Sequence, residues 1–508
     1  MSETISKKNT ATNRTERPPV VVVMGHIDHG KSKLLDYIRK TNIVEGEVGG
    51  ITQHLSAYEV VHKTESGTEK KITFLDTPGH AAFEKMRYRG AEVADIAILI
   101  VSAEEGVKAQ TLEAFRAIKA SGVPFVVAIN KIDKPTANIE KTKQGLSENE
   151  IYLEGMGGDV PFVAISAKEG TGVSELLDLV LLIAELEELT GDPHTLAEGV
   201  VIEAERDAKK GMTATLLIQN GILKKGMYVI SENTSAPVRI MENFLGVNVD
   251  EASMGAPVRI IGFDTLPRAG APFKTVLDKK EARAMASAYT EISNAKTSRG
   301  EQTNDEDIVT LPLIIKADVS GSLDALLGEV EKIQAEGVSV KIIHTGVGEI
   351  TEGDVKMAGG KEETVIIGFH VDVLNSAREH AERLGMTIVT FDIIYKVTEY
   401  LEELVKKRTP KQRVSEITGK AKILRTFSTI KNRQVIGGKV IEGSLCVKGR
   451  IRIIRRDILI GEGVIRNLQQ QKVNAKEVSE GEEFGAEVES KNSIAAGDIL
   501  ESFIIVEK

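Results

Sequence analysis

The stretch Gly25-His26-Ile27-Asp28-His29-Gly30-Lys31-Ser32 directly follows the apolar run from Val20 to Met24 and precedes apolar residues at helical spacing. A glycine-rich loop between a buried strand and a helix is the context of a phosphate-binding loop. Its two glycines let backbone N–H groups and the helix N-terminus face an anion. We therefore expect these eight residues to hold nucleotide phosphates, with Lys31 reaching the β- and γ-phosphates and Ser32 offering a hydroxyl to Mg²⁺.

The fold around this loop follows from the apolar runs that come after it. Each run is four to six residues long, is bounded by Gly, Pro or Asp, and is separated from the next by a helical pattern; the runs are 72–75, 96–101, 125–129 and 162–165. Such runs are typical of strands buried on both faces. The alternation predicts a phosphate-loop domain over residues 18–190, with a parallel sheet between two layers of helices. Residues 1–17 are polar and aperiodic, so we expect disorder there.

Two short motifs at later strand ends point to guanine as the base. In Asn130-Lys131-Ile132-Asp133, the Asp133 carboxylate can accept hydrogen bonds from N1–H and the exocyclic amine of guanine. Adenine lacks this pair of donors and would leave a buried charge unpaired. Ser166-Ala167-Lys168 follows another strand and fits as the loop that closes over the base. All these motifs lie at carboxyl ends of strands, where open α/β sheets bind ligands.

A third motif, Asp76-Thr77-Pro78-Gly79, is expected to sense the γ-phosphate. Asp76 would contact Mg²⁺ through water, and the N–H of Gly79 would reach the phosphate. Thr52, after Gly49-Gly50-Ile51, is the candidate for the second switch hydroxyl on the metal. His80 directly follows Gly79 and is the candidate for orienting the hydrolytic water. No arginine finger is evident in the sequence, so we expect slow intrinsic hydrolysis and an external activator.

The rest of the chain predicts a multidomain protein of α/β plus β class. At 508 residues, roughly three to four domains are expected. Asn220-Gly221 predicts a hairpin, and Gly221 to Ile230 parallels Ser444 to Ile453, which suggests that one barrel occurs twice. The predicted parts are a β-barrel over 195–276, a partly helical linker over 277–310, an α/β/α domain over 311–394, a connecting helix over 395–411 and a C-terminal β-barrel over 412–508.

Composition excludes several classes of protein. Hydrophobic content of 41% and charged content of 28% are ordinary globular values, and no apolar run approaches the ~20 residues of a spanning helix. The polar start and the single cysteine, Cys446, favour a cytoplasmic protein without a membrane segment.

The net charge is -10, but residues 411–472 hold 15 Lys and Arg against 4 acidic residues. This local excess predicts a surface for nucleic acid, although a solvated charged strand is the alternative.

With these motifs in view, the chain resembles bacterial translation initiation factor two, a ribosome-activated GTPase. The most specific matches are Gly49 to His54, Asp76 to Phe83, Met86-Arg87 with Arg89-Gly90-Ala91, and Ile315 to Val319 with Gly321-Ser322. The resemblance runs from about Pro18 to the C-terminus, without the long N-terminal extension of many members. It implies GTP or GDP with Mg²⁺ as ligands, and a water-positioning role for His80 on the ribosome.

The resemblance also implies the partners. These are initiator tRNA carrying formylmethionine, the small subunit on which it is held, the large subunit whose joining is promoted, and other initiation factors, with the chain itself a monomer. The family binds the tRNA on its last barrel, where Arg450, Arg452, Arg455 and Arg456 are candidates for phosphate contacts.

This chain departs from its relatives in the family's formylmethionine pocket. Many members have Gly-Cys at Gly443-Ser444, Glu-Cys-Gly at Glu483-Phe484-Gly485, and Lys-Arg-Tyr-Lys at Gln469-Gln470-Gln471-Lys472. Ser444, Lys472, Glu483, Phe484 and Gly485 are the candidate pocket residues, and formyl recognition is the property that the substitutions affect most directly.

Two other functions stay open from the sequence. An elongator or specialised tRNA carrier would share the nucleotide motifs, but it does not need the second α/β unit or the basic helix before Pro410. A GTP sensor in ribosome assembly that does not hydrolyse would share them too. Phosphate release with and without both ribosomal subunits identifies a sensor, which would release none in either case.

Overall fold

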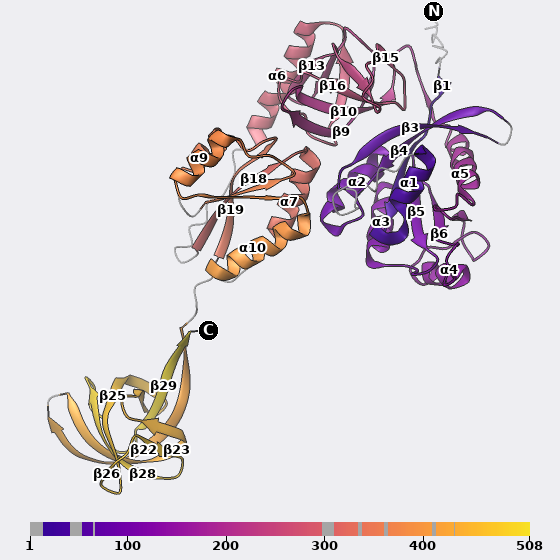
Figure 1. Ribbon diagram of the computed structural model, residues 1–508. Coiled ribbons are helices and arrows are strands. Elements are labelled where there is room, and N and C mark those ends of the chain that lie inside the picture. Colours follow the sequence, from indigo (N-terminus) through magenta and orange to yellow (C-terminus); the bar gives the residue numbers. More distant parts are fainter. Residues whose placement is uncertain are drawn as a thin grey trace, which may run out of the picture. The chain divides into compact units, whose positions relative to one another are not determined.

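The computed structural model describes residues 14–40, 53–64, 67–296, 309–333, 338–359, 364–408, 413–430 and 432–507. The chain divides into two compact units, Met1–Arg408 and Thr409–Lys508. Figure 1 shows their elements, coloured along the sequence. Thr52 lies outside the described residues, as do Gly49, Gly50 and Ile51.

The first domain contains a six-stranded sheet between two helical layers. Its strand order is β3-β4-β2-β5-β6-β7, and every neighbouring pair is parallel except β3 with β4. The strands are β2 (Val20–Gly25), β3 (Ser56–Lys63), β4 (Glu69–Asp76), β5 (Ile96–Ser102), β6 (Phe125–Asn130) and β7 (Phe162–Ala164). The predicted α/β architecture is confirmed. Strand β3 was not predicted, because its half-buried residues do not form a continuous apolar run.

Helices cover both faces of this sheet. One apolar core joins it to α1 (Lys31–Arg39) and α5 (Val173–Leu186). A second core, on the other face, joins it to α2 (Glu84–Val93), α3 (Ala109–Ser121) and α4 (Ile139–Glu148). The parallel strands are therefore shielded on both sides, which agrees with their unbroken apolar sequences.

The expected disorder over residues 1–17 is wrong for its last residues. Strand β1 (Thr15–Glu16) pairs antiparallel with β8 (Thr190–Gly191). Both terminal nitrogens of the Arg17 guanidinium donate to the Asp95 carboxylate, at 2.6 and 2.5 Å. A bidentate ion pair of this kind orders the chain although the local composition is polar. Residues 1–13 lie outside the described part of the chain.

The second domain is a seven-stranded antiparallel sheet in the order β13-β12-β17-β9-β10-β16-β14. Its strands are β9 (Glu198–Asp207), β10 (Gly211–Asn220), β12 (Tyr228–Ser231), β13 (Thr234–Pro237), β14 (Met241–Asn243), β16 (Pro257–Ile261) and β17 (Pro272–Val276).

The hairpin predicted at Asn220-Gly221 is wrong: β10 pairs with β9 and β16, whereas β11 (Leu223–Lys224) pairs with β15 (Glu251–Ala252). The turn is present, with φ of +76° at Gly221, but it joins two different sheets. Helix α6 (Lys279–Lys296) follows.

The third domain is a parallel four-stranded sheet in the order β19-β18-β20-β21. Its strands are β18 (Val309–Ala317), β19 (Val338–Val347), β20 (Val365–Phe369) and β21 (Thr387–Phe391). Its helices are α7 (Ser320–Lys332), α8 (Glu352–Met357), α9 (Asn375–Arg383) and α10 (Ile394–Arg408), of which α10 is the predicted connecting helix. None of the helices in the described ranges is long and apolar enough to cross a bilayer.

The second unit is a closed barrel in which β22 and β23 complete the ring. Its strands are β22 (Arg413–Ile430), β23 (Arg433–Cys446), β24 (Arg450–Arg455), β25 (Ile458–Gln470), β26 (Val473–Asn474), β27 (Glu477–Ser479), β28 (Glu483–Ser490) and β29 (Ile499–Glu507). The pairing path β24-β29-β22-β23-β28 repeats the path β12-β17-β9-β10-β16 of the second domain. The repeat suggested by the sequence is thus present in the strand pairing. The borders between the predicted domains stay a prediction.

Candidate nucleotide site

The phosphate loop fits against the neighbouring strands only because two of its residues are glycine. Gly25 ends β2 with φ of +143°, and a Cβ there would collide with the carbonyl oxygen of Ile100 in β5. Gly30 precedes α1 with φ of +88°, and a Cβ there would lie 2.5 Å from Nδ2 of Asn130. L-residues with side chains rarely adopt such φ values. Between the glycines, Ile27–His29 form one turn of 3₁₀ helix.

Lys31 is folded back into its own loop. Its Nζ donates to the carbonyl oxygens of Gly25, at 2.8 Å, and His26, at 2.9 Å. Burial lowers the pKa of this ammonium to about 8. A Cβ on Gly79 would lie 2.5 Å from the same Nζ, so the structure brings together the two groups predicted to contact the γ-phosphate. These bonds use two of the three N–H donors of the ammonium, which leaves a third for a phosphate oxygen.

The base-recognition motifs are joined to the phosphate loop by Asn130 at the end of β6. Its Nδ2 donates to the carbonyl oxygen of His29 at 2.8 Å, and its Oδ1 accepts from the N–H of Ala167 at 2.9 Å. The Ser166 hydroxyl donates to Asp133 Oδ1 at 2.8 Å, and this bond lowers the pKa of the carboxyl. The residues predicted to bind guanine therefore form one connected group, with an ionised carboxylate at its open side.

Other predicted residues surround this group. Asp28 lies in the 3₁₀ turn, Ile27 N–H donates to Gln110 Oε1 at 3.2 Å, and Lys131 Nζ lies 3.2 Å from Glu105 Oε1. The positive charge of Lys168 helps to lower the pKa of Asp133.

Two described residues offer oxygen ligands for Mg²⁺. Ser32 lies in the first turn of α1, and the buried Asp76 ends β4, where it is in register with Val23 of β2. β2 leads directly into the loop before α1, so Asp76 and Ser32 lie at the same end of the sheet. A hydroxyl and a carboxylate are hard oxygen ligands, which Mg²⁺ prefers.

His80 is buried against the connecting helix. Its Nδ1 accepts from the N–H of Ala82 at 2.9 Å, at the start of a 3₁₀ turn over Ala81–Phe83. Its ring lies edge-on to Tyr395 of α10, with centroids 3.7 Å apart. Burial lowers the pKa of His80 to about 4, so the imidazole is neutral at pH 7. Among the described residues, none forms a hydrogen bond with its Nε2.

Arg87 of α2 was not among the predicted site residues. Its guanidinium is 1% exposed and donates to the carbonyl oxygens of His80 and of Pro78, the latter at 3.3 Å. It also pairs with Glu113 of α3 at 2.9 Å. Arg87 therefore holds the backbone on both sides of Gly79. The Met86-Arg87 motif was a signal for its importance, but its bonds to two backbone carbonyls cannot be read from spacing.

The candidate tRNA residues in the second unit have unequal surroundings. Arg455 forms a bidentate pair with Asp498, at 2.8 Å for both bonds. Arg452 lies 4.5 Å from the centroid of the Phe503 ring and donates to the Ser415 hydroxyl. Arg450 is exposed and has no ion pair among the described residues. The basic excess predicted from the sequence is thus partly neutralised by carboxylates from the last strands.

The substituted pocket residues are brought together only in part: Gln469 lies opposite Gly485 across β25 and β28. Ser444 lies opposite Ser479 of β27, whereas Glu483 to Gly485 lie opposite Lys439 to Gly437 farther along β23. Phe484 is 5% exposed and belongs to the barrel core, which places its ring away from the solvent. Arg456 and Lys472 lie in turns with φ of +49° and +68°. A tRNA contact at these positions stays a prediction.

Comparisons with known proteins match three segments of the chain to families of translation factors. Residues 16–185 match the family of the elongation factor Tu GTP binding domain, residues 196–276 match elongation factor G domain 2, and residues 286–402 match translation-initiation factor 2. The chain is 44% identical to translation initiation factor IF-2 of Bacillus licheniformis and of Bacillus subtilis, over 97% of this chain and 69% of each relative. A crystal structure of GDP-bound aIF5B from Aeropyrum pernix is 28% identical, with a TM-score of 0.48, over 96% of this chain and 92% of that one.

Proposed function

The chain belongs to the IF-2 family of translation initiation factors and is a GTPase, and from this premise we propose that its GTP form holds initiator tRNA on the small ribosomal subunit. Joining of the large subunit then stimulates hydrolysis, and the GDP form leaves. The observation that supports this proposal most is the connected group of Asn130, Asp133, Ser166 and the phosphate loop. Its hydrogen bonds link the residues proposed to select the base to the loop proposed to bind the phosphates.

In the proposed hydrolysis, His80 orients the attacking water. The low pKa keeps the imidazole neutral at physiological pH, with one acceptor nitrogen. That nitrogen, Nδ1, takes the Ala82 N–H, so this bond must break before the ring can accept a hydrogen bond from water. The ring is now packed on Tyr395, so it must turn toward the γ-phosphate before it can act. We propose that engagement with the ribosome moves α10 away from His80 and allows this rotation. Arg87 keeps the backbone beside Gly79 in place during the change.

Mg²⁺, when bound, would neutralise charge on the β- and γ-phosphates. Ser32 and Asp76 would hold it, the latter through water, together with Thr52. Lys31 would direct its third N–H donor at a phosphate oxygen while it bonds the carbonyls of Gly25 and His26.

The C-terminal barrel is proposed to bind the acceptor end of initiator tRNA. Arg450 is the strongest candidate for a phosphate contact, because it is exposed and unpaired among the described residues. Arg452 and Arg455 already have partners within the barrel and would have to share their donors.

Phosphate release from GTP, measured with and without both ribosomal subunits, tests this function. We expect strong stimulation by the two subunits together. His80→Ala should leave GTP affinity within about twofold and lower the stimulated rate by about 10²–10⁴-fold, the usual worth of a positioned acid–base group. His194→Ala, an exposed histidine beyond the GTPase domain, is the matched control. A His80→Ala protein that hydrolyses at the wild-type rate on ribosomes would reject the assigned role.

A further inference from the structure

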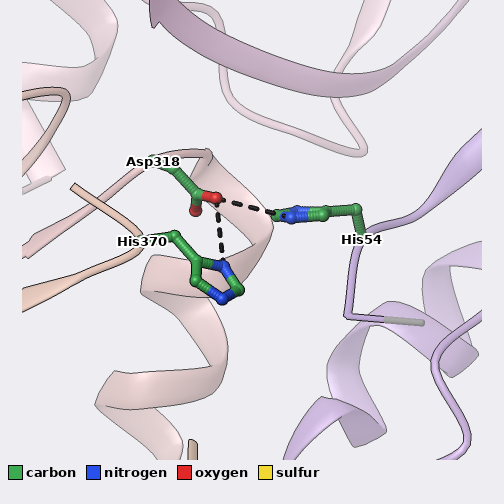
Figure 2. A group of neighbouring side chains, drawn as sticks. All are labelled: His54, Asp318 and His370. Carbon is green, nitrogen blue, oxygen red and sulfur yellow. Dashed lines mark ion pairs between the residues drawn. The ribbon is translucent and has the colours of Figure 1, made fainter. Parts of the chain in front are cut away.

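Three side chains from two domains meet beside the switch region. His54 comes from the segment before β3, Asp318 follows β18, and His370 follows β20. Figure 2 shows both imidazoles directed at one carboxylate. His54 Nε2 and His370 Nδ1 each lie 3.4 Å from the same Asp318 Oδ2. These three atoms all lie within 4.8 Å of one another.

The spacing of these atoms suits a common metal ion. Zinc binds imidazole nitrogen and carboxylate oxygen at ~2.0–2.1 Å, so two ligands at a tetrahedral angle are about 3.3–3.4 Å apart. Both nitrogen–oxygen distances in the cluster have this value, which is longer than the ~2.7–2.9 Å of a charge-assisted hydrogen bond. The two nitrogen–oxygen distances therefore fit ligands around a shared centre, and the two nitrogens lie within 4.8 Å of each other. Without a metal, the same contacts are ion pairs, and Asp318 raises the pKa of His370.

The second nitrogen of His370 is already fixed. Its Nε2 lies 2.7 Å from the carbonyl oxygen of Asp392 and donates its proton there. In the neutral ring, this leaves the lone pair on Nδ1, which is the atom that faces Asp318 and His54. Metal-bound histidines characteristically donate their other ring N–H to a carbonyl or carboxylate in this way. The φ of His370 is +51°, an unusual conformation that the site maintains for a β-carbon-bearing residue.

We propose that His54, Asp318 and His370 form a binding site for one divalent cation of the zinc type. Two imidazoles and one carboxylate favour Zn²⁺ over Mg²⁺ or Ca²⁺, which prefer oxygen ligands only. Water can supply the fourth ligand, because His54 and Asp318 both line an open hollow of ≈ 430 Å³.

The cation would connect the GTPase domain to the α/β/α domain. His54 lies two residues after Thr52, and the neighbouring Gln53 donates to the carbonyl oxygen of Asp392 at 3.1 Å. The same carbonyl accepts from His370. Occupancy of the site would therefore restrain the segment after Thr52 against the third domain. This consequence does not depend on whether the chain binds tRNA.

Zinc binding by the full chain tests the proposal. The protein is treated with a chelator, exchanged into metal-free buffer, and titrated with Zn²⁺ in a calorimeter. Metal content is then measured after gel filtration. We expect one tightly bound equivalent for the wild-type protein. His370→Asn and Asp318→Asn should each lower the affinity at least tenfold, because each removes one of three ligands.

Two control variants separate this site from other histidines. His344→Asn removes an imidazole whose Nε2 lies 3.7 Å from Asp354 in the same domain. His26→Asn removes one ring of a histidine pair in the phosphate loop, where the centroids are 4.9 Å apart. Both should bind zinc like the wild type. Melting curves in metal-free buffer verify that every variant is folded.

Substituting Co²⁺ for Zn²⁺ adds a direct view of the ligands. A four-coordinate site should give intense visible absorption, which His370→Asn and Asp318→Asn should lose. Absence of a retained equivalent in the wild type would overturn the proposal. So would equal binding by His370→Asn and the wild type, because the zinc would then be held elsewhere in the chain. Loss of binding in His26→Asn alone would also overturn it, by placing the zinc at the phosphate loop.

Discussion

At the scale of single residues, Asp133 determines the choice of base. Its carboxylate is half-buried and ionised, and the Ser166 hydroxyl donates to one of its oxygens at 2.8 Å. The second oxygen and the remaining lone pairs are available to the two donors of guanine. Base selection therefore depends on the Asp133 carboxylate, whose orientation is set by Ser166, 33 positions farther along the chain.

Replacing Asp133 by Asn should move the preference from guanine to xanthine nucleotides. The carboxamide can donate to the C2 oxygen of xanthine, while guanine loses an acceptor at a cost of about 1–3 kcal/mol, or roughly tenfold to a hundredfold in affinity. Competition binding with a fluorescent nucleotide measures this ratio. Asp159→Asn, at an exposed position of the same domain, is the control and should change nothing. A variant that still strongly prefers GTP would contradict the assignment of Asp133.

At the scale of elements, α10 meets the switch region through an apolar core and through an aromatic pair. Its buried residues Ile394, Val397, Leu401 and Val405 belong to a core that the third domain shares with Ala82, Phe83 and Met86, the residues that follow His80. Tyr395 lies outside this core group and packs on His80. The helix is therefore anchored in the shared core, while Tyr395 covers the candidate catalytic residue itself.

Tyr395→Ala should increase GTP hydrolysis in the absence of ribosomes. An aromatic pair contributes about 0.5–1.5 kcal/mol beyond its buried area, so losing it should raise the population of freely rotating His80 by roughly two- to tenfold. Single-turnover phosphate release measures the change. Tyr400→Ala is the matched control, because Tyr400 lies on the same helix but packs on Phe391. An unchanged rate in Tyr395→Ala would mean that this contact does not restrain His80.

At the scale of the whole molecule, three domains meet at the start of α7. Glu203 of β9 is buried and accepts from the Ser320 hydroxyl at 2.6 Å and from the N–H of Gly321 at 2.9 Å. Burial raises the pKa of Glu203, and these hydrogen bonds oppose the rise. A Cβ on Gly321 would lie 2.5 Å from Met86 Cε and 2.6 Å from Glu203 Oε2. A larger residue at this junction therefore requires the buried ends of the Met86 and Glu203 side chains to move.

Gly321→Ala should destabilise the protein by about 1–3 kcal/mol, the usual cost of adding a methyl group to a packed site. Thermal unfolding of the full chain, followed by circular dichroism, measures the shift of the first transition. Gly328→Ala in the same helix is the control, because a Cβ there meets nothing within 4 Å. It should stabilise by up to ~1 kcal/mol through helix propensity. Equal behaviour of the two variants would show that the junction can relax.

The second unit can be studied alone, since its apolar core consists only of residues between Ala421 and Leu500. Residues 409–508 should bind initiator tRNA with an affinity that falls steeply with salt. Arg450→Gln should reduce the salt slope by about one, as expected for one lost phosphate contact. Lys476→Gln, outside the basic region, should leave the slope unchanged. Filter binding measures both, and an absence of binding at low salt would remove the charge argument.

The sequence by itself determined the local features of this protein. Glycine spacing predicted the phosphate loop, apolar periodicity predicted the parallel sheets, and the order of the motifs predicted the grouping of Lys31 with Gly79. These three features were predictable because they depend on contacts within one strand–loop–helix unit or on the shared edge of a sheet. The excess of Lys and Arg over residues 411–472 was likewise evident from the composition alone.

Only the tertiary structure decided which distant groups became partners. It placed Tyr395 on His80, joined His54 to Asp318 and His370, paired β10 with β9 and β16 instead of β11, and turned Phe484 into the barrel core. Such contacts join residues separated by tens to hundreds of positions, and packing among all domains selects them. The spacing of residues in the sequence carries no information on that selection, because short-range periodicity reports only which face of an element is buried.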